Sequence, residues 1–147
     1  MLTINVDDSA FRTDLAALYR RLGDLTEVMG SIGMEMESRV SGRFETRSDP
    51  SGRAWAAWAP STVANYPDDG NRKLLDRYGD MMLSLSHKAD STSVTIGFGQ
   101  PYAVFHEWGT KHMPRRGLMF ADPDAGTLAP GDEEAVLDMI GVWISGS

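Results

Sequence analysis

LAALYRRLGDLTEVMGSIGMEMESRVSGRF, from Leu15 to Phe44, carries a regular apolar pattern. Its apolar residues recur in steps of three and four, which places them along one face of a helix. The pattern predicts a long N-terminal helix that can break near Gly23 or Gly30, since glycine weakens a helix by about 1 kcal/mol relative to alanine. The apolar stripe packs either on its own domain or, in part, on a neighbouring subunit. Its members are Leu15, Leu18, Leu22, Leu25, Met29, Ile32 and Met36, extended by Val40 and Phe44.

Several shorter segments have the composition of strands. LTINV, residues 2–6, alternates apolar and polar side chains, and GLMF, residues 117–120, predicts a last short strand. MLSLSHKA (82–89) and TSVTIGFG (92–99) also alternate, and the turn-forming residues between them predict a β-hairpin. Residues 74–79 fit either a short helix or a strand. The sheet is therefore expected to be small and antiparallel.

Three further segments predict helices. Pro60 can begin a short helix that ends near Tyr66, and Pro101 precedes a second short helix from Tyr102 to Trp108. GDEEAVLDMIGVWI, residues 131–144, predicts a closing helix capped by Asp132. We therefore expect one α+β domain over residues 1–147, in which the long N-terminal helix packs on the small sheet, with short helices and a C-terminal helix. The core side of the closing helix is expected to be Val136, Ile140 and Trp143 or Ile144.

Composition limits the classes of function. The chain has 147 residues, 41% of them hydrophobic, which suits a globular domain. It contains no cysteine, which excludes disulfides, thiolate zinc sites and cysteine nucleophiles. A formal charge of −7 argues against general binding to nucleic-acid phosphates. No apolar run reaches the ~20 residues that span a bilayer, and the N-terminus lacks a secretory signal pattern. We expect no membrane contact and synthesis in a cytoplasm.

YAVFHEWGTKHMPRR, residues 102–116, is the segment in which a metal site has to be considered. Zinc peptidases place two histidines four residues apart on one helix, so that both rings reach one ion. Here His112 follows His106 by six residues, which is about 120° away around a helix, and Gly109 is expected to end that helix first. With no third histidine nearby, the sequence predicts neither a metal nor another cofactor. The alternative is a metal-assisted hydrolase that uses His106, Glu107 and His112.

A structural role explains this segment better. Val104, Phe105 and Trp108 are expected to be buried, and His106 to be a structural histidine that both donates and accepts a hydrogen bond. Glu107 can accept from the N–H of a nearby turn or pair with Arg115. No nucleophile elbow and no phosphate loop is present elsewhere in the chain. The sequence therefore predicts that the protein is not an enzyme.

Five motifs, in order along the chain, resemble the phage virion morphogenesis family, the tail-completion proteins of Mu-like and related contractile-tailed bacteriophages. The similarity covers roughly residues 10–145, and each motif alone is weak. The first four motifs are a Pro-x-Gly-x-x-Trp turn, a helix begun by Ser or Thr, Leu-x-x-x-Gly-x-Met and Tyr-Ala-x-x-His-x-x-Gly. The fifth is a Pro-Arg segment one residue looser than the family pattern. The matching residues are Pro50, Gly52, Trp55, Ser61, Thr62, Leu75, Gly79, Met81, Tyr102, Ala103, His106, Gly109, Pro114, Arg115 and Leu118 or Met119.

This resemblance implies a structural protein that completes the tail or the head–tail joint through protein–protein contacts. It implies a virion protein assembled in the host bacterial cytoplasm, with other tail or neck proteins as partners. It also implies a homo-oligomeric ring, for which six-fold symmetry is one expectation. Lys111, Arg115 and Arg116 could line the lumen and touch DNA passing through it. Candidate structural or interaction residues are Trp55, Tyr102, His106, Glu107, Gly109, Arg115 and Arg116, of which Trp55, Tyr102, His106 and Arg115 are expected to converge.

Overall fold

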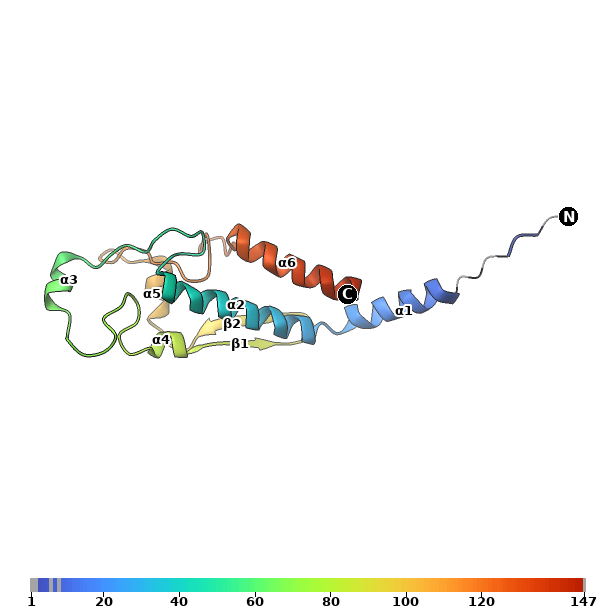
Figure 1. The fold of residues 1–147 in the computed structure, drawn as a ribbon, viewed down its shortest axis with the longest axis horizontal. Coiled ribbons are helices and arrows are strands. Elements are labelled where there is room, and N and C mark those ends of the chain that lie inside the picture. Colours follow the sequence, from blue (N-terminus) through green and yellow to red (C-terminus); the bar gives the residue numbers. More distant parts are fainter. Residues whose placement is uncertain (1–2, 6, 8, 147) are drawn as a thin grey trace.

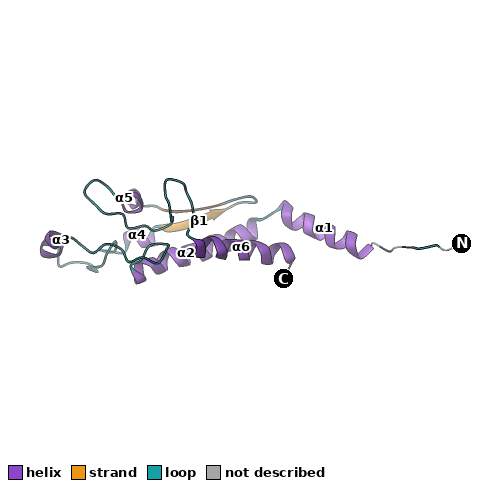
Figure 2. Cartoon of the chain, turned by 90° about the horizontal axis from the view of Figure 1, so that it is seen from above, coloured by secondary structure: helices purple, strands orange, loops and turns teal. Residues whose placement is uncertain are grey.

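The computed structural model describes residues 3–5, 7 and 9–146, and it is an elongated molecule (Figure 1). It combines helices with one antiparallel hairpin, which confirms the α+β prediction. Figure 2 shows the helices and the hairpin along the long axis, with α1 extending beyond them at one end. The elements are α1 (Ser9–Gly23), α2 (Thr26–Thr46), α3 (Pro60–Asn65), α4 (Asp80–Leu83), β1 (Leu85–Ala89), β2 (Val94–Phe98), α5 (Ala103–Trp108) and α6 (Pro130–Ser145).

The predicted N-terminal helix breaks after Gly23 and runs through Gly30 without interruption. Two hydrogen bonds explain the position of the break. The backbone N–H of Thr26 donates to the Asp24 carboxylate at 3.0 Å, so that this side chain satisfies a free donor at the start of α2. The N–H of Leu25 donates to the carbonyl of Ser91 in the hairpin turn at 3.1 Å. Gly30 has no such competing contact and stays helical.

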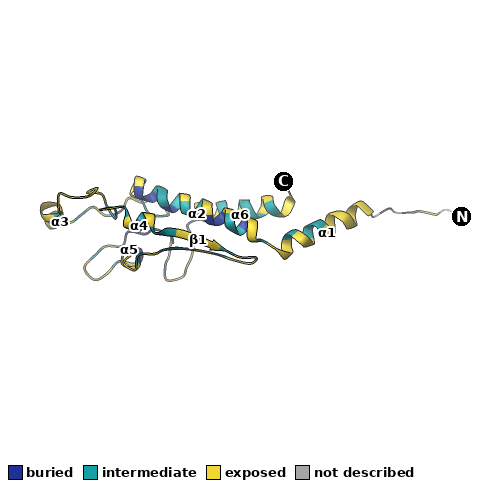
Figure 3. Cartoon of the chain, turned by 90° about the horizontal axis from the view of Figure 1, so that it is seen from below, coloured by how far each residue is buried: buried dark blue, intermediate teal, exposed yellow. Residues whose placement is uncertain are grey.

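The break divides the apolar stripe into two parts with different surroundings (Figure 3). In α2, Ile32, Met36 and Phe44 are each 3% exposed, and they form the centre of the molecule. In α1, Leu15 is 38% exposed and Leu22 is 46% exposed. The stripe therefore packs on its own domain mainly after the break.

The core consists of two clusters that follow one another along α2. The first contains Ile32 and its neighbours, and it is covered by β2 and by the inner face of α6; its members include Val28, Met36, Val94, Ile96, Val136, Ile140 and Trp143. The second contains Phe44, and residues of α4, α5 and the connecting loops pack against it; its members include Val40, Trp55, Met81, Ala103 and Leu118. Helix α2 is thus the element that both clusters share.

The predicted hairpin is confirmed. Strands β1 and β2 pair antiparallel, with Leu85 opposite Phe98 and Ala89 opposite Val94. The hairpin packs so closely on α2 that a Cβ on Gly33 would lie 2.3 Å from the His87 ring. A larger residue at that position would have to displace the His87 side chain.

Other strand predictions are wrong. Residues 117–120 form no strand, because their backbone N–H groups are used by a side chain described below. Residues 3–5 form no strand, and residues 2 and 6 lie outside the described part of the chain. The strand predicted from Met82 begins only at Leu85, since the short helix α4 occupies the residues before it. Residues 74–79 form neither a helix nor a strand.

The closing helix is confirmed, but its predicted cap is wrong. Pro130 occupies the first turn of α6, where its missing N–H costs nothing, so Asp132 falls inside the helix. The Asp132 side chain is buried and pairs with Arg43 of α2. Arg43 also donates through Nη1 to the Leu118 carbonyl at 2.6 Å. A second arginine, Arg39, lies 3.4 Å from the same carboxylate. Asp132 therefore joins α6 to α2.

We predict that Asp132→Ala lowers the free energy of unfolding by about 3 kcal/mol, because it leaves the buried Arg43 charge without its partner. Glu134→Ala, which removes an exposed carboxylate from the same helix, is the control and should change stability little. Urea denaturation followed by circular dichroism measures both. Equal loss in the two variants would contradict a dominant role for the buried pair.

Candidate functional site

The carboxylate of Glu107 organises the loop that follows α5. One oxygen, Oε2, accepts from the backbone N–H groups of Leu118 at 2.7 Å and Met119 at 3.0 Å. The other, Oε1, accepts from the N–H of Phe120 at 3.0 Å. Glu107 is 5% exposed. A buried carboxylate requires such donors, and three consecutive N–H groups turned toward one side chain cannot pair in a sheet.

Arg115 completes this arrangement. Its Nη2 lies 3.2 Å from Oε1 of Glu107 and donates to the Phe120 carbonyl at 2.6 Å. Its Nε donates to the backbone carbonyl of Glu107 at 2.7 Å. The sequence left two partners open for Glu107, a turn N–H or Arg115, and the structure shows both.

The adjacent Arg116 is directed to another segment. It is 7% exposed, and its guanidinium donates to the carbonyls of Ala56 at 2.8 Å and Ala57 at 3.1 Å. Trp55 reaches the same loop, since its Nε1 donates to the Gly117 carbonyl at 2.9 Å. The loop is therefore tied to α5, to residues 55–57 and, through Arg43, to α2.

Trp55 and Trp58, three residues apart, do not share the face of a helical turn. Trp55 is buried and packs edge-on against Phe44, with ring centroids 5.8 Å apart. Trp58 stacks on Tyr66 instead, with centroids 4.4 Å apart. The segment that carries both is not helical, so a spacing of three does not place the two rings on one side.

Gly109 ends α5, as the sequence predicts. Its φ of +74° lies in a region that other residues rarely adopt. A Cβ there would also lie 2.9 Å from the backbone nitrogen of Arg115. The glycine thus lets the chain turn back closely enough for Arg115 to reach Glu107.

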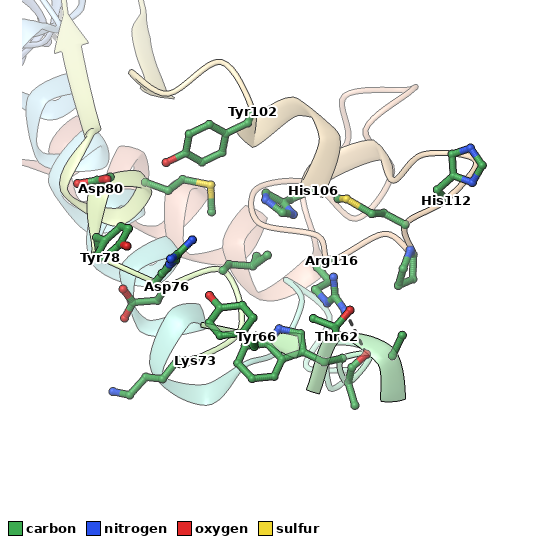
Figure 4. Close-up of a pocket in the computed structure, with 18 residues that line it drawn as sticks. Thr62, Tyr66, Lys73, Asp76, Tyr78, Asp80, Tyr102, His106, His112 and Arg116 are labelled. Atoms are coloured by element: carbon green, nitrogen blue, oxygen red, sulfur yellow. Dashed lines mark hydrogen bonds between the residues drawn. The ribbon is translucent and has the colours of Figure 1, made fainter. Parts of the chain in front are cut away.

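His106 faces an open cleft of about 620 Å³, which Figure 4 shows in close-up. Its ring lies edge-on to that of Tyr102, with centroids 6.4 Å apart. Its Nδ1 is buried and has no hydrogen-bond partner among the described residues, contrary to the expectation of a ring that both donates and accepts. Burial lowers the pKa of His106, and the charge of Arg116 lowers it further. Other lining residues are Trp58, Tyr66, Tyr78 and Arg116.

His112 does not join His106. It is exposed in the loop, and Figure 4 shows its ring directed away from the centre of the cleft. Glu107 is also engaged, because both of its oxygens accept hydrogen bonds from the loop. Within residues 3–5, 7 and 9–146, no three His, Asp or Glu side chains are placed to hold a metal ion. The geometry gives the hydrolase alternative no support.

The predicted burial of three α5 side chains is wrong. Val104 is 55% exposed, Phe105 is 53% exposed and Trp108 is 45% exposed. The helix instead turns Ala103 and Glu107, four residues apart, toward the core. The carboxylate is buried because the loop supplies its donors, and the larger apolar side chains consequently lie on the outer face of α5.

The four residues expected to converge do gather around one loop. Tyr102 contacts His106, and the His106 carbonyl accepts from the N–H of Arg116 at 2.9 Å. Arg115, within the loop, donates to the Glu107 carbonyl, and Trp55 donates to the Gly117 carbonyl. These contacts link the turn, the α5 histidine and the Pro-Arg segment whose order along the chain suggested a family.

The sequence pattern of the phage virion morphogenesis family matches residues 6–144. The chain belongs to this family. Membership supports a role in the assembly of phage virions and places the protein among virion-associated proteins. No curated protein and no solved structure matches the chain. In the described part of this virion morphogenesis protein, no helix is long and apolar enough to cross a membrane.

Two residues that hold the site in place are not identified from the sequence of this family member. Arg43 and Asp132 bind the loop and α6 to α2, whereas the sequence predicts a helix cap at Asp132 and gives Arg43 no role. The signal for Arg43 is its place in the apolar pattern: it follows Val40 by three residues and Met36 by seven, which puts it on the buried face of the helix.

We predict that Glu107→Gln lowers the free energy of unfolding by about 2–4 kcal/mol. The amide offers one oxygen and one NH₂ group, so it turns a donor toward N–H groups that then lack an acceptor. Glu45→Gln, on an exposed position of α2, is the matched control. Thermal and urea denaturation of the two variants should differ clearly. A Glu107→Gln variant as stable as the control would show that the loop does not depend on this carboxylate.

We predict that His106 makes stability fall as the pH drops below about 6.5, the ordinary histidine value. Because its pKa is lowered in the folded protein, the unfolded chain takes up a proton first, so acid favours unfolding. Between pH 7.5 and 5.5, wild type should therefore lose more free energy of unfolding than His106→Leu. Parallel slopes for wild type and His106→Leu would contradict the prediction.

Proposed function

We propose that the protein completes the phage tail or the head–tail joint as a structural component, acting through protein–protein contacts and not through catalysis. The single observation that carries this proposal is the exposure of large apolar side chains at separate places on a folded chain of this family. Such patches mark interaction surfaces on soluble proteins.

One patch lies on α5, whose outer face presents Val104, Phe105 and Trp108. The loop network fixes this face, because Glu107 anchors the same helix from its inner side. Trp108 is also held through its Nε1, which donates to Asp124 at 2.9 Å. A rigid aromatic side chain of this kind gives up little conformational entropy on binding. The α5 patch is therefore a candidate contact with another tail or neck protein.

A second exposed apolar surface lies on α1, at the other end of the long axis (Figure 1). A subunit with separate apolar surfaces can contact a second copy through one of them, as in a homo-oligomeric ring, and another virion protein through the other. The α5 patch and the α1 surface are therefore proposed to serve different contacts.

Contact with DNA in a lumen is a weaker proposal. Arg115 and Arg116 are occupied within the fold by Glu107 and by backbone carbonyls. Lys111 is exposed in the same loop, so a DNA contact would depend on this side chain. Phosphate binding of this kind would weaken steeply with salt.

We predict that a phage lacking this gene makes heads and tails that do not become complete, infectious particles. Supplying the wild-type protein from a plasmid should restore infectious titre, and electron microscopy should show which joint is missing. His106→Leu/His112→Leu, checked for folding by circular dichroism, should restore titre as well, because the proposed role uses no chemistry at these histidines. A deletion phage that yields normal infectious particles would refute the role.

A further inference from the structure

Helix α1 presents an apolar stripe that the described chain leaves largely exposed, with Leu18 half-buried. Phe11 is 67% exposed, Leu15 is 38% exposed and Leu22 is 46% exposed, and no residue of α1 is buried. With Leu18, these side chains lie within about 60° of one another around the helix, at 100° per residue. Figure 3 shows α1 extending away from the body, exposed over most of its surface.

Burial of apolar side chains contributes little to the stability of α1. Isolated helices of ~12–15 residues are marginal in water, and most helices in proteins are stabilised by burial of one face. Helix α1 has 15 residues and touches the rest of its chain near its C-terminal end, where Arg21 donates to the Ile144 carbonyl at 3.2 Å. A partner that covers the stripe would supply the missing burial.

The chain itself shows which kind of surface suits this stripe. The continuation of the same pattern in α2, which includes Met29 and Ile32, packs on the inner face of α6. There Val136, Ile140 and Trp143 cover it. A face of α6 therefore covers the second half of the stripe within one subunit.

Helix α6 has a second apolar face, beside the first, that stays exposed. Leu137 is 59% exposed and Ile144 is 40% exposed. Gly141 lies between them, four residues after the one and three before the other, so the three share one side of the helix. No atom lies within 4 Å of the place where a Cβ of Gly141 would stand. The face is thus an apolar strip with a gap that can receive a side chain.

The two helices carry opposite charges. Helix α1 has three basic residues and one acidic residue, for a net charge of +2; these are Arg12, Arg20, Arg21 and Asp14. Helix α6 has four acidic residues and no basic one, and one of the four, Asp132, pairs with Arg43 and Arg39 of α2. Glu133, Glu134 and Asp138 remain exposed. Two copies of α1 would repel one another, whereas α1 and α6 attract.

We propose that α1 of one copy packs on the exposed Leu137–Gly141–Ile144 face of α6 in a second copy of this chain. The contact is head-to-tail, because it joins two different surfaces, and repeated contacts of this type close into a ring or continue as a filament. The inference deepens the proposed function and rests on its protein–protein contacts. It names the surfaces by which one subunit meets the next.

Two substitutions and two controls test the contact. Leu15→Glu places a charge in the α1 stripe, and Leu137→Glu places one on the α6 strip. Thr13→Glu makes the same charge change on the opposite side of α1. Val142→Glu does so on α6 at a side chain of similar exposure, 54% against 59% for Leu137, but on another face. Circular dichroism and thermal denaturation of each full-length variant verify that the body of the protein stays folded.

Sedimentation velocity over a range of concentrations measures the assembly. Wild type and both controls should form oligomers, which high salt weakens. Leu15→Glu and Leu137→Glu should each lose them. An equimolar mixture of these two variants should form dimers that neither forms alone, because each still has one intact surface.

A wild-type protein that stays monomeric at all concentrations would overturn the proposed contact. So would a Leu137→Glu variant that assembles like wild type, since α1 would then bind elsewhere, for example to another virion protein. Neither result bears on the deletion phage, whose titre tests the role in virion assembly. Failure of the contact and failure of the proposed function are therefore distinguishable.

Discussion

The fold around α5 depends on one buried carboxylate. Three successive backbone N–H groups, from Leu118 to Phe120, cannot be left without acceptors in the interior, and Glu107 satisfies all of them. Once this loop is fixed, its carbonyls become acceptors at defined places. Trp55 and Arg43 donate to Gly117 and Leu118, and they join the loop to the Trp55 segment and to α2. A polar network of this kind orders a loop that has no sheet or helix of its own.

The parts of the fold that the sequence predicts are those governed by local periodicity. The hairpin and the closing helix follow from spacing and turn residues. A break in the N-terminal helix follows from its glycines, but its place after Gly23 and not at Gly30 depends on the contact of Leu25 with Ser91. The errors arise where a distant partner changes a local preference. GLMF has strand composition, but Glu107 takes its N–H groups, and Asp132 has the chemistry of a cap but lies opposite Arg43. No pattern within one segment contains either partner.

The candidate site shows the same division. Gly109 and the pairing of Glu107 with Arg115 are predictable, because their chemistry allows few other roles at that spacing. The orientation of α5 is not predictable in this way. Three apolar side chains suggest the buried face, but the carboxylate gains more by facing the loop, since an unpaired buried N–H costs about 1–3 kcal/mol. The hydrogen bonds between Glu107 and the loop N–H groups decide the orientation of the helix, and Val104 and Phe105 therefore lie on the surface.

This outcome connects the stability of the subunit with its surface. Where polar contacts hold a loop and a helix in place, the apolar side chains of that helix are not needed in the core. They lie on the surface, where another protein can contact them. On α5, Glu107 holds the helix from its inner side, so the apolar side chains on its outer face are fixed. On α1, the apolar side chains lie beyond the break at Asp24, on a helix that is bound to α6 near its C-terminal end. The first is a preformed surface, and the second gains its order from what it binds. A subunit with one surface of each kind can be folded before assembly and still be stabilised by its neighbours.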